Sequence, residues 1–118
     1  MLESQGLRAA YTRGGGNAAS ISYRANYSST TDATSYTFAS SDIGTATDRS
    51  IVVVAIHSRS ASSSVSVSSV TIGGVSATQA VSIGTLFITQ IWYATGVSGT
   101  TGDIVVTMNT TAERCLIS

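Results

Sequence analysis

The sequence predicts an all-β fold, an antiparallel β-sandwich or jelly roll of about eight strands with an extended N-terminal arm. Composition is the first reason, because Val and Ile total 21 residues while Leu, Met, Glu, Gln and Lys together total 11. β-branched residues favour pleated sheets, and unbranched residues favour helices. The second reason is the spacing of the apolar runs. Runs of strand length recur about every ten residues and are separated by segments rich in Ser, Thr and Gly.

Two regions are expected, an arm over residues 1–19 and a β domain over residues 20–118. The arm contains Gly14-Gly15-Gly16, and its apolar residues follow no strand period. It is either a frayed terminus or a segment that orders against a neighbouring subunit, with Arg8 and Arg13 binding carboxylates there. The domain ends inside an apolar run, so its last strand either pairs with a neighbour or is cut short.

In the first half of the domain, alternation over Ile21–Tyr27 predicts a half-buried strand. Tyr36 and Phe38 alternate in a second, short strand that leads into a turn over residues 41–44. The strongest element is Ser50–His57, whose core is apolar on both faces. Such a run predicts a central strand in a sheet that is covered on both sides.

In the second half, the low-complexity segment Ser58–Ser64 predicts a mobile loop. Val65, Val67, Val70 and Ile72 form a strand in which the extra residue at Ser68-Ser69 predicts a β-bulge. Two adjacent glycines between alternating runs predict a hairpin. The hairpin glycines are Gly73-Gly74. The remaining expected strands are Leu86–Thr95, Asp103–Met108 and Cys115–Ile117.

Charge excludes several classes of partner. Six Arg balance six acidic residues, Lys is absent, and only 10% of the residues are charged. A nucleic-acid-binding protein needs a basic stripe, which six scattered Arg do not form. No apolar run approaches the length of about 20 residues that a membrane helix needs, and no signal peptide is apparent. A domain of zero net charge tends to associate, so we expect this one to function inside an assembly.

Residue chemistry does not indicate an enzyme. His57 is the only histidine, and its neighbour Ser58 points to the opposite face of the strand, so the pair cannot act as nucleophile and base. We therefore interpret His57 as a strand-end or interface residue. The single cysteine, Cys115, excludes an intrachain disulfide and is expected to be a small core residue.

No metal or cofactor site is predicted. One His and one Cys are too few for a conventional zinc site. Asp42, Asp48 and Asp103 are the only plausible calcium ligands, and each lies at a strand boundary where Asp commonly stabilises a turn. Gly14-Gly15-Gly16 lacks the Lys and the following helix of a phosphate loop.

Three aromatic residues gather on one predicted strand. Phe87, Trp92 and Tyr93 form either a carbohydrate-binding platform or a combination of core and subunit contact. Trp92 and Tyr93 fall on opposite faces, so at most one of them packs with the core. Together with Arg8 and Arg13, Trp92 and Tyr93 are the candidate partner-binding residues.

A series of blocks between residues 34 and 115 resembles the Ser/Thr/Gly-rich β domains of virion structural proteins from tailed bacteriophages and prophages. The N-terminal arm takes no part in this resemblance. The blocks, in order, are Thr34–Phe38, Asp42–Ala46, Asp48–Arg59, Val67–Thr78, Ile91–Ala94 and Gly99–Thr107.

The resemblance implies a virion component, and a carbohydrate-active enzyme has no pair of acidic residues to support it. The first hypothesis is a capsid decoration or cement protein, a homo-oligomer that binds the major capsid protein and stabilises the head lattice. The alternative is a tail, baseplate or fibre domain that contacts a receptor on the host surface. Long exposed strand edges normally carry Lys or Pro to block pairing, and this chain has neither, so we expect its edges to be occupied by partners.

Overall fold

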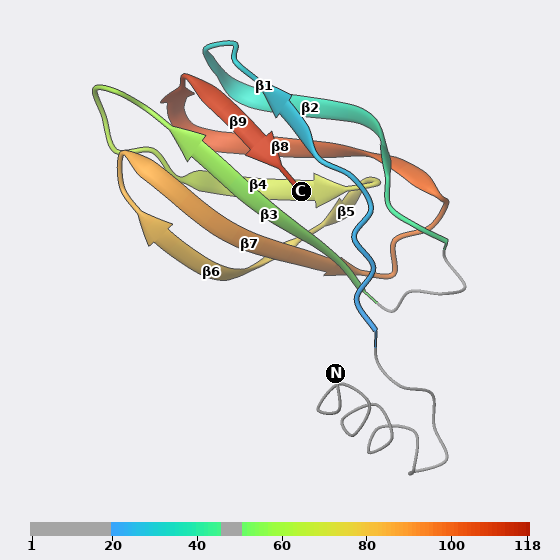
Figure 1. Ribbon diagram of the computed structural model, residues 1–118. Helices are drawn as coiled ribbons and strands as arrows, with labels where there is room; N and C mark the ends of the chain where they lie inside the picture. The colour runs from blue at the N-terminus through green and yellow to red at the C-terminus, as the bar shows by residue number, and fades with distance from the viewer. Residues whose placement is uncertain (1–19, 46–50) are drawn as a thin grey trace, which may run out of the picture.

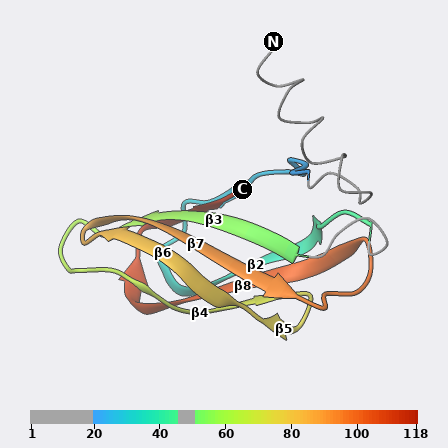
Figure 2. The ribbon, with the colours of Figure 1, turned by 90° about the horizontal axis from the view of Figure 1, so that it is seen from below.

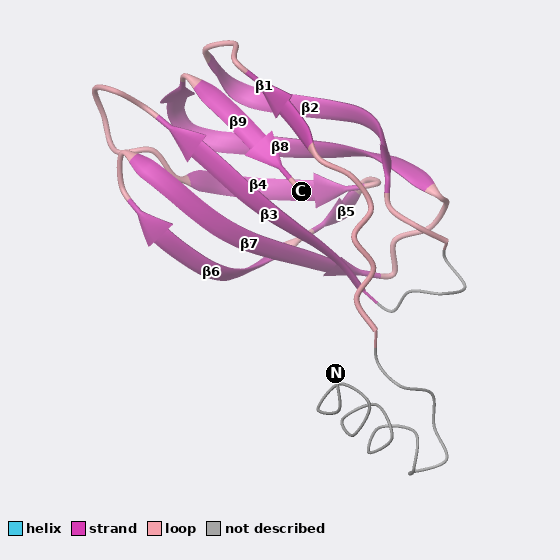
Figure 3. Ribbon diagram, in the orientation of Figure 1, coloured by secondary structure: helices cyan, strands magenta, loops and turns pink. Residues whose placement is uncertain are grey.

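The computed structural model describes residues 20–45 and 51–118. The predicted arm over residues 1–19 lies outside the described residues. Every regular element within the described part is a strand, and all strand pairs are antiparallel (Figure 3). The predicted all-β fold is confirmed, with nine strands where the sequence indicated about eight.

Two sheets lie face to face as a sandwich (Figures 1 and 2). In spatial order, the five-stranded sheet contains β1 (Tyr27–Ser29), β9 (Arg114–Ile117), β3 (Ile51–Arg59), β7 (Phe87–Thr95) and β6 (Thr78–Gly84). The four-stranded sheet contains, in order, β2 (Ala33–Asp42), β8 (Thr101–Ala112), β4 (Val67–Ile72) and β5 (Val75–Ser76). Figure 2 shows β3, β7 and β6 in one layer above β8, β4 and β5 in the other.

The core fills the space between the two layers. Alternation puts every second residue of each strand on the inner face, so Val54 and Ile56 of β3 are buried while Val53 between them is exposed. The opposite sheet contributes Ile72 and Val106, which have no exposed surface. Burial of apolar side chains from both sheets is therefore the main source of stability.

Two local predictions are confirmed. Gly73 and Gly74 join β4 to β5 with φ values of 57° and 81°, the left-handed conformation at both positions that glycine adopts without strain. The register of β4 against β8 shifts between Val67 and Ser69, which is the bulge that Ser68-Ser69 predicted.

One predicted strand is wrong, because the alternating segment Ile21–Tyr27 is irregular up to Asn26. β1 begins only at Tyr27, which pairs with Ile117 at the end of β9. Residues before Asn26 therefore lie beyond the end of the partner strand, and alternation alone does not make a strand without a partner. The segment is instead held by an ion pair of 3.1 Å between Arg24 and Asp42.

The sequence also missed β6. All seven of its residues are exposed, so no buried face marks this segment as a strand. The chain leaves β5 in one sheet, crosses at Ala77 and enters β6 in the other sheet. The backbone of Ala77 is held to the first sheet by a hydrogen bond of 2.9 Å from its N–H to the carbonyl of Val70.

Aspartates stabilise the turns, as expected for Asp42 and Asp103. The carboxylate of Asp42 accepts a hydrogen bond of 2.9 Å from the N–H of Gly44. Asp103 accepts one of 2.9 Å from the N–H of Ser40, a residue with φ of 51° at a register shift of β2. The third aspartate of that group, Asp48, lies outside the described residues.

Gly84, the last residue of β6, should be less replaceable than Gly96. Its φ is +99°, and a Cβ atom there would overlap the backbone carbonyl oxygen of Phe87. Gly96 is the matched control, since its φ is +70° but nothing lies within 4 Å of its added Cβ. We expect Gly96→Ala to lower the free energy of unfolding by about 1 kcal/mol through strain alone. Gly84→Ala should lower it by about 3 kcal/mol or more.

Urea denaturation of the two variants measures this difference. Equal loss of stability in the two variants would contradict a steric role for Gly84.

Candidate functional site: the outer face of the five-stranded sheet

The outer face of the five-stranded sheet carries many apolar side chains, with Thr78, Thr89 and Thr95 between them. Register places Val53 beside Tyr93, Ala55 beside Ile91, and Val81 of β6 on the other side of Ile91. Val53 is 54% exposed and Phe87 is 68% exposed. We call this surface the apolar face and define it by Ile51, Val53, Ala55, Val81, Ile83, Phe87, Ile91, Tyr93 and Leu116.

This surface corrects one expectation about the central strand. β3 does lie in the middle of its sheet, between β9 and β7. The sequence predicted a sheet covered on both sides, but the described residues cover only the inner side. Ile51 and Val53 are accordingly exposed, although the apolar residues of β3 are typical of a buried strand.

The other outer surface of the sandwich has a different character. On the four-stranded sheet, register aligns Ser35, Thr107 and Ser69 in one row across β2, β8 and β4. The next row contains Thr37 and Thr71 on either side of Val105. We call these two rows the hydroxyl face. Water hydrogen-bonds readily to such a surface, whereas the aliphatic side chains of the apolar face offer water no hydrogen-bond partner.

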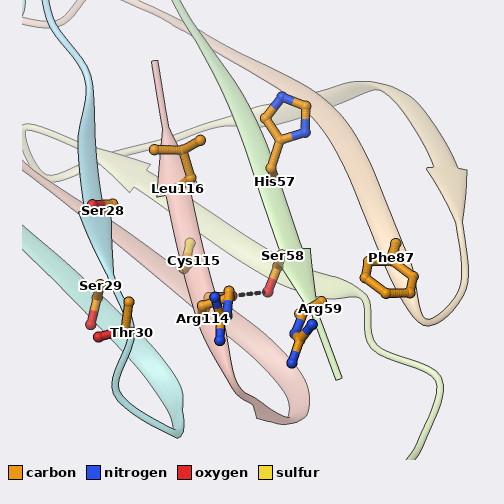
Figure 4. Close-up of a pocket in the computed structure, with 10 residues that line it drawn as sticks. All are labelled: Ser28, Ser29, Thr30, His57, Ser58, Arg59, Phe87, Arg114, Cys115 and Leu116. Atoms are coloured by element: carbon orange, nitrogen blue, oxygen red, sulfur yellow. Dashed lines mark hydrogen bonds between the residues drawn. The ribbon is translucent and has the colours of Figure 1, made fainter. Parts of the chain in front are cut away.

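Two arginines, Arg59 and Arg114, lie at one end of the apolar face. A hollow of about 350 Å³ opens there, where β1, β9 and the end of β3 meet. Figure 4 shows the residues around it, and we call it the basic hollow. Its lining comprises Ser28, Ser29, Thr30, His57, Ser58, Arg59, Phe87, Arg114, Cys115 and Leu116.

Two arginines lie directly opposite each other in this hollow. Arg59 of β3 pairs in register with Arg114 of β9, an arrangement that is unfavourable for like charges. Glu113 relieves it by accepting hydrogen bonds of 3.0 and 2.8 Å from the Arg59 guanidinium, which also lies 5.9 Å from the centre of the Phe87 ring. The guanidinium of Arg114 has no ion-pair partner within residues 20–45 and 51–118. The surface of the hollow is mainly apolar, and Arg114 adds a cationic group at its edge.

The aromatic pair divides between core and surface. Trp92 is buried, and its indole N–H donates a hydrogen bond of 2.8 Å to the Gln90 side chain, which donates in turn to the hydroxyl of Ser82. Tyr93 points outward in the apolar face, as the opposite faces of neighbouring strand residues require. Trp92 therefore packs in the core, and Tyr93 alone of the pair lies on the outer surface. The other two candidates, Arg8 and Arg13, lie outside the described residues.

His57 and Ser58 point to opposite sides of the sheet. The imidazole Nδ1 lies 3.0 Å from the Thr89 hydroxyl on the outer face. The Ser58 hydroxyl is buried and donates a hydrogen bond of 2.7 Å to the carbonyl of Arg114. The histidine therefore has no access to this serine as a nucleophile.

Other classes of site are not seen in the described part of the chain. No cluster of three His, Cys, Asp or Glu side chains suited to a metal ion occurs among those residues. The same residues contain no helix capable of crossing a membrane. Comparison of the chain with protein-family models, with curated proteins and with solved structures finds no match.

Glu113 should make the stability of the domain depend on acid pH. The backbone N–H of Ala61 and the Arg59 guanidinium both donate to its carboxylate and lower its pKa from the usual 4.5. A group whose pKa is lower in the folded state stabilises the protein above the unfolded pKa, and this contribution is lost as the pH falls through the folded pKa. We therefore expect the melting temperature to fall below pH 4.5, and to fall less steeply in Glu113→Gln.

Calorimetry of both proteins between pH 3 and pH 7 tests this expectation. Parallel pH profiles for wild type and variant would show that Glu113 contributes nothing.

Cys115 should be inert in the folded protein. Burial raises the pKa of its thiol to about 12, so the reactive thiolate is almost absent at neutral pH. We expect iodoacetamide at pH 8 to leave the native protein unlabelled and to label it fully in urea, as measured by intact mass. Rapid labelling of the native protein would contradict the buried position of this thiol.

Proposed function

We propose that this protein is a structural component of a bacteriophage particle, a decoration protein that binds and stabilises the capsid. The apolar face carries this proposal. Contiguous apolar patches of more than a few hundred Å² are rare on monomeric soluble proteins and mark interaction surfaces. The resemblance of residues 34–115 to phage virion domains indicates that the partner belongs to a phage particle.

The distribution of polar groups supports a binding role over a catalytic one. The hydroxyl of Ser58 is engaged by a backbone carbonyl, and His57 faces away from it. Glu113 is engaged by Arg59 and by the N–H of Ala61. Among the described residues, an apolar sheet face stays exposed, and so does Arg114, which has no ion-pair partner there. Both suit the docking of another protein.

The strand edges support the same role. β6 forms one edge of its sheet and has only exposed residues, with no charge among its side chains. β2 forms an edge of the other sheet over ten residues and carries a single charged residue, Asp42, at its end. Edges without charge or proline are open to pairing unless a neighbour covers them.

A domain that contacts a host receptor through the tail is the second candidate. Aromatic side chains were the sequence feature in its favour, and burial of Trp92 removes one of them. Tyr93 is half-buried between Val53 and Thr78, so a single aromatic side chain of the pair remains at the surface. Decoration of the head is therefore the function we put forward.

Quantitative mass spectrometry of purified particles tests this proposal. A decoration protein should be present at a copy number comparable to that of the major capsid protein. Deletion of residues 1–16 should then weaken attachment, because Arg8 and Arg13 are the proposed contacts to capsid carboxylates, while circular dichroism shows the β domain intact. A copy number far below that of the capsid protein would favour the tail, and absence from particles would exclude both.

A further inference from the structure

We infer that β3 receives an extended strand from another virion protein, which enters in line with β9 and completes the five-stranded sheet. The strand binds along what we call the open edge, the side of residues 51–54 that faces the line of β9. The source of the strand rests on the proposed function. The site itself rests on backbone hydrogen bonds and on the exposure of the residues around it.

The open edge begins where β9 ends. β3 pairs with β7 along all nine of its residues, but its pairs with β9 cover only residues 56–59. One further residue, Ala55, exchanges two backbone hydrogen bonds of 2.9 and 3.0 Å with Ser118. Figure 1 shows β3 extending past this point without a neighbour on that side. The first four residues of β3 are therefore paired on one side only.

The backbone of Val53 offers a donor and an acceptor at the open edge. In an antiparallel sheet, residues two apart on a strand direct their N–H and C=O groups to the same neighbouring strand. Val53 lies two residues from Ala55, so its N–H and C=O point toward the line of β9 and away from β7. No backbone group within residues 20–45 and 51–118 bonds to them. Edge groups of this kind are a template for a further strand.

Residues 21–26 flank the same line on its other side. Tyr27 of β1 pairs with Ile117, so a strand that continued the line of β9 would run opposite residues 21–26. These residues alternate as strand residues do, yet Ile21 is 102% exposed and Tyr23 is 68% exposed. In a strand they would share the inner face with Tyr27, which packs against the core. One added strand would therefore give a partner to two segments at once.

The ion pair that holds residues 21–26 in their present place is weak. It joins Arg24 to Asp42, whose side chains are 45% and 43% exposed. Exposed ion pairs contribute little to stability because water and salt screen them. Residues 21–26 can therefore leave this contact and join the sheet when a strand arrives.

The residues of the open edge define the strand that fits. They are Ile51, Val52, Val53 and Val54, and none is charged. The inner positions of an added strand would lie beside Val52 and Val54 and would need apolar side chains, whereas its outer positions would face solvent. The matching strand is uncharged, at least four residues long and apolar at alternate positions. The arm over residues 1–19 has no such pattern and contains three consecutive glycines, so a partner protein is the source.

Extension of the chain itself tests the open edge. The sequence Val-Thr-Val-Thr, added after Ser118, would place its two valines beside Val54 and Val52 and its second residue opposite Val53. We expect the melting temperature to rise by about 5 °C. In hydrogen exchange followed by NMR, the amide of Val53 should exchange at least about 10-fold more slowly. Val-Pro-Val-Thr is the matched control, because its proline lacks the N–H that would bond the carbonyl of Val53, and it should leave both values near those of wild type.

Variants of Val53 test the partner in purified particles. Val53→Pro removes the N–H at the open edge and leaves the hydrogen bonds between β3 and β7, so we expect about 10-fold fewer copies per particle. Val53→Thr also replaces the side chain but keeps the N–H, and it should attach as wild type does. The chain extended by Val-Thr-Val-Thr should attach poorly although it is more stable, because its own extension occupies the open edge. That chain keeps the test independent of the folding of Val53→Pro.

Several outcomes would overturn the inference. Equal melting temperatures and equal exchange of the Val53 amide in wild type and both extended chains would show that the open edge accepts no strand. Normal attachment of Val53→Pro and of the extended chain would show that the partner binds elsewhere. A Val53 amide that is protected in wild type and exposed by deletion of residues 1–16 would assign the open edge to the arm. Absence of wild type from particles would remove the proposed function, and the extension would still decide whether the open edge binds a strand.

Discussion

The central strand β3 sets the constraint on which the rest of the structure depends. Its nine residues pair with β7 along their whole length, and its last four also pair with β9. Because successive strand residues face opposite sides, a run that is apolar at every position must produce one apolar surface toward the core and another away from it. The core and the apolar face are both consequences of that run.

Local patterns predicted much of the fold. The glycine pair at 73–74 and the extra serine at 68–69 act within a few residues, so sequence alone located the hairpin and the bulge. Strand limits that depend on distant partners were not predictable in this way. Ile21–Asn26 has a strand pattern but lies beyond the end of β9, whereas β6 lacks a buried face yet pairs with β7. In both cases tertiary pairing, rather than the side-chain pattern, decides the backbone conformation.

The candidate site was only half visible in the sequence. The apolar content of Ser50–His57 indicated that both faces of this strand require cover, and the opposite orientations of Trp92 and Tyr93 were foreseeable from their adjacency. The basic hollow was not foreseeable, because it combines Ser28, Arg59 and Arg114 from three strands that lie far apart in the sequence. No spacing rule connects these positions. Only the register of β3 with β9 shows that two arginines meet and that a single glutamate serves one of them.

The hydroxyl face has a consequence for how the molecule meets its surroundings. Serine and threonine hydroxyls do not ionise in the biological pH range. The two rows of the hydroxyl face, Ser35, Thr107 and Ser69 and then Thr37 and Thr71, therefore stay uncharged as the pH changes. An outer coat built from such rows is a neutral, water-binding layer. Such a layer binds charged polymers such as nucleic acids and polyanionic sugars weakly, because their adsorption depends on counterion release. The four-stranded sheet would thus behave toward them as an antifouling surface.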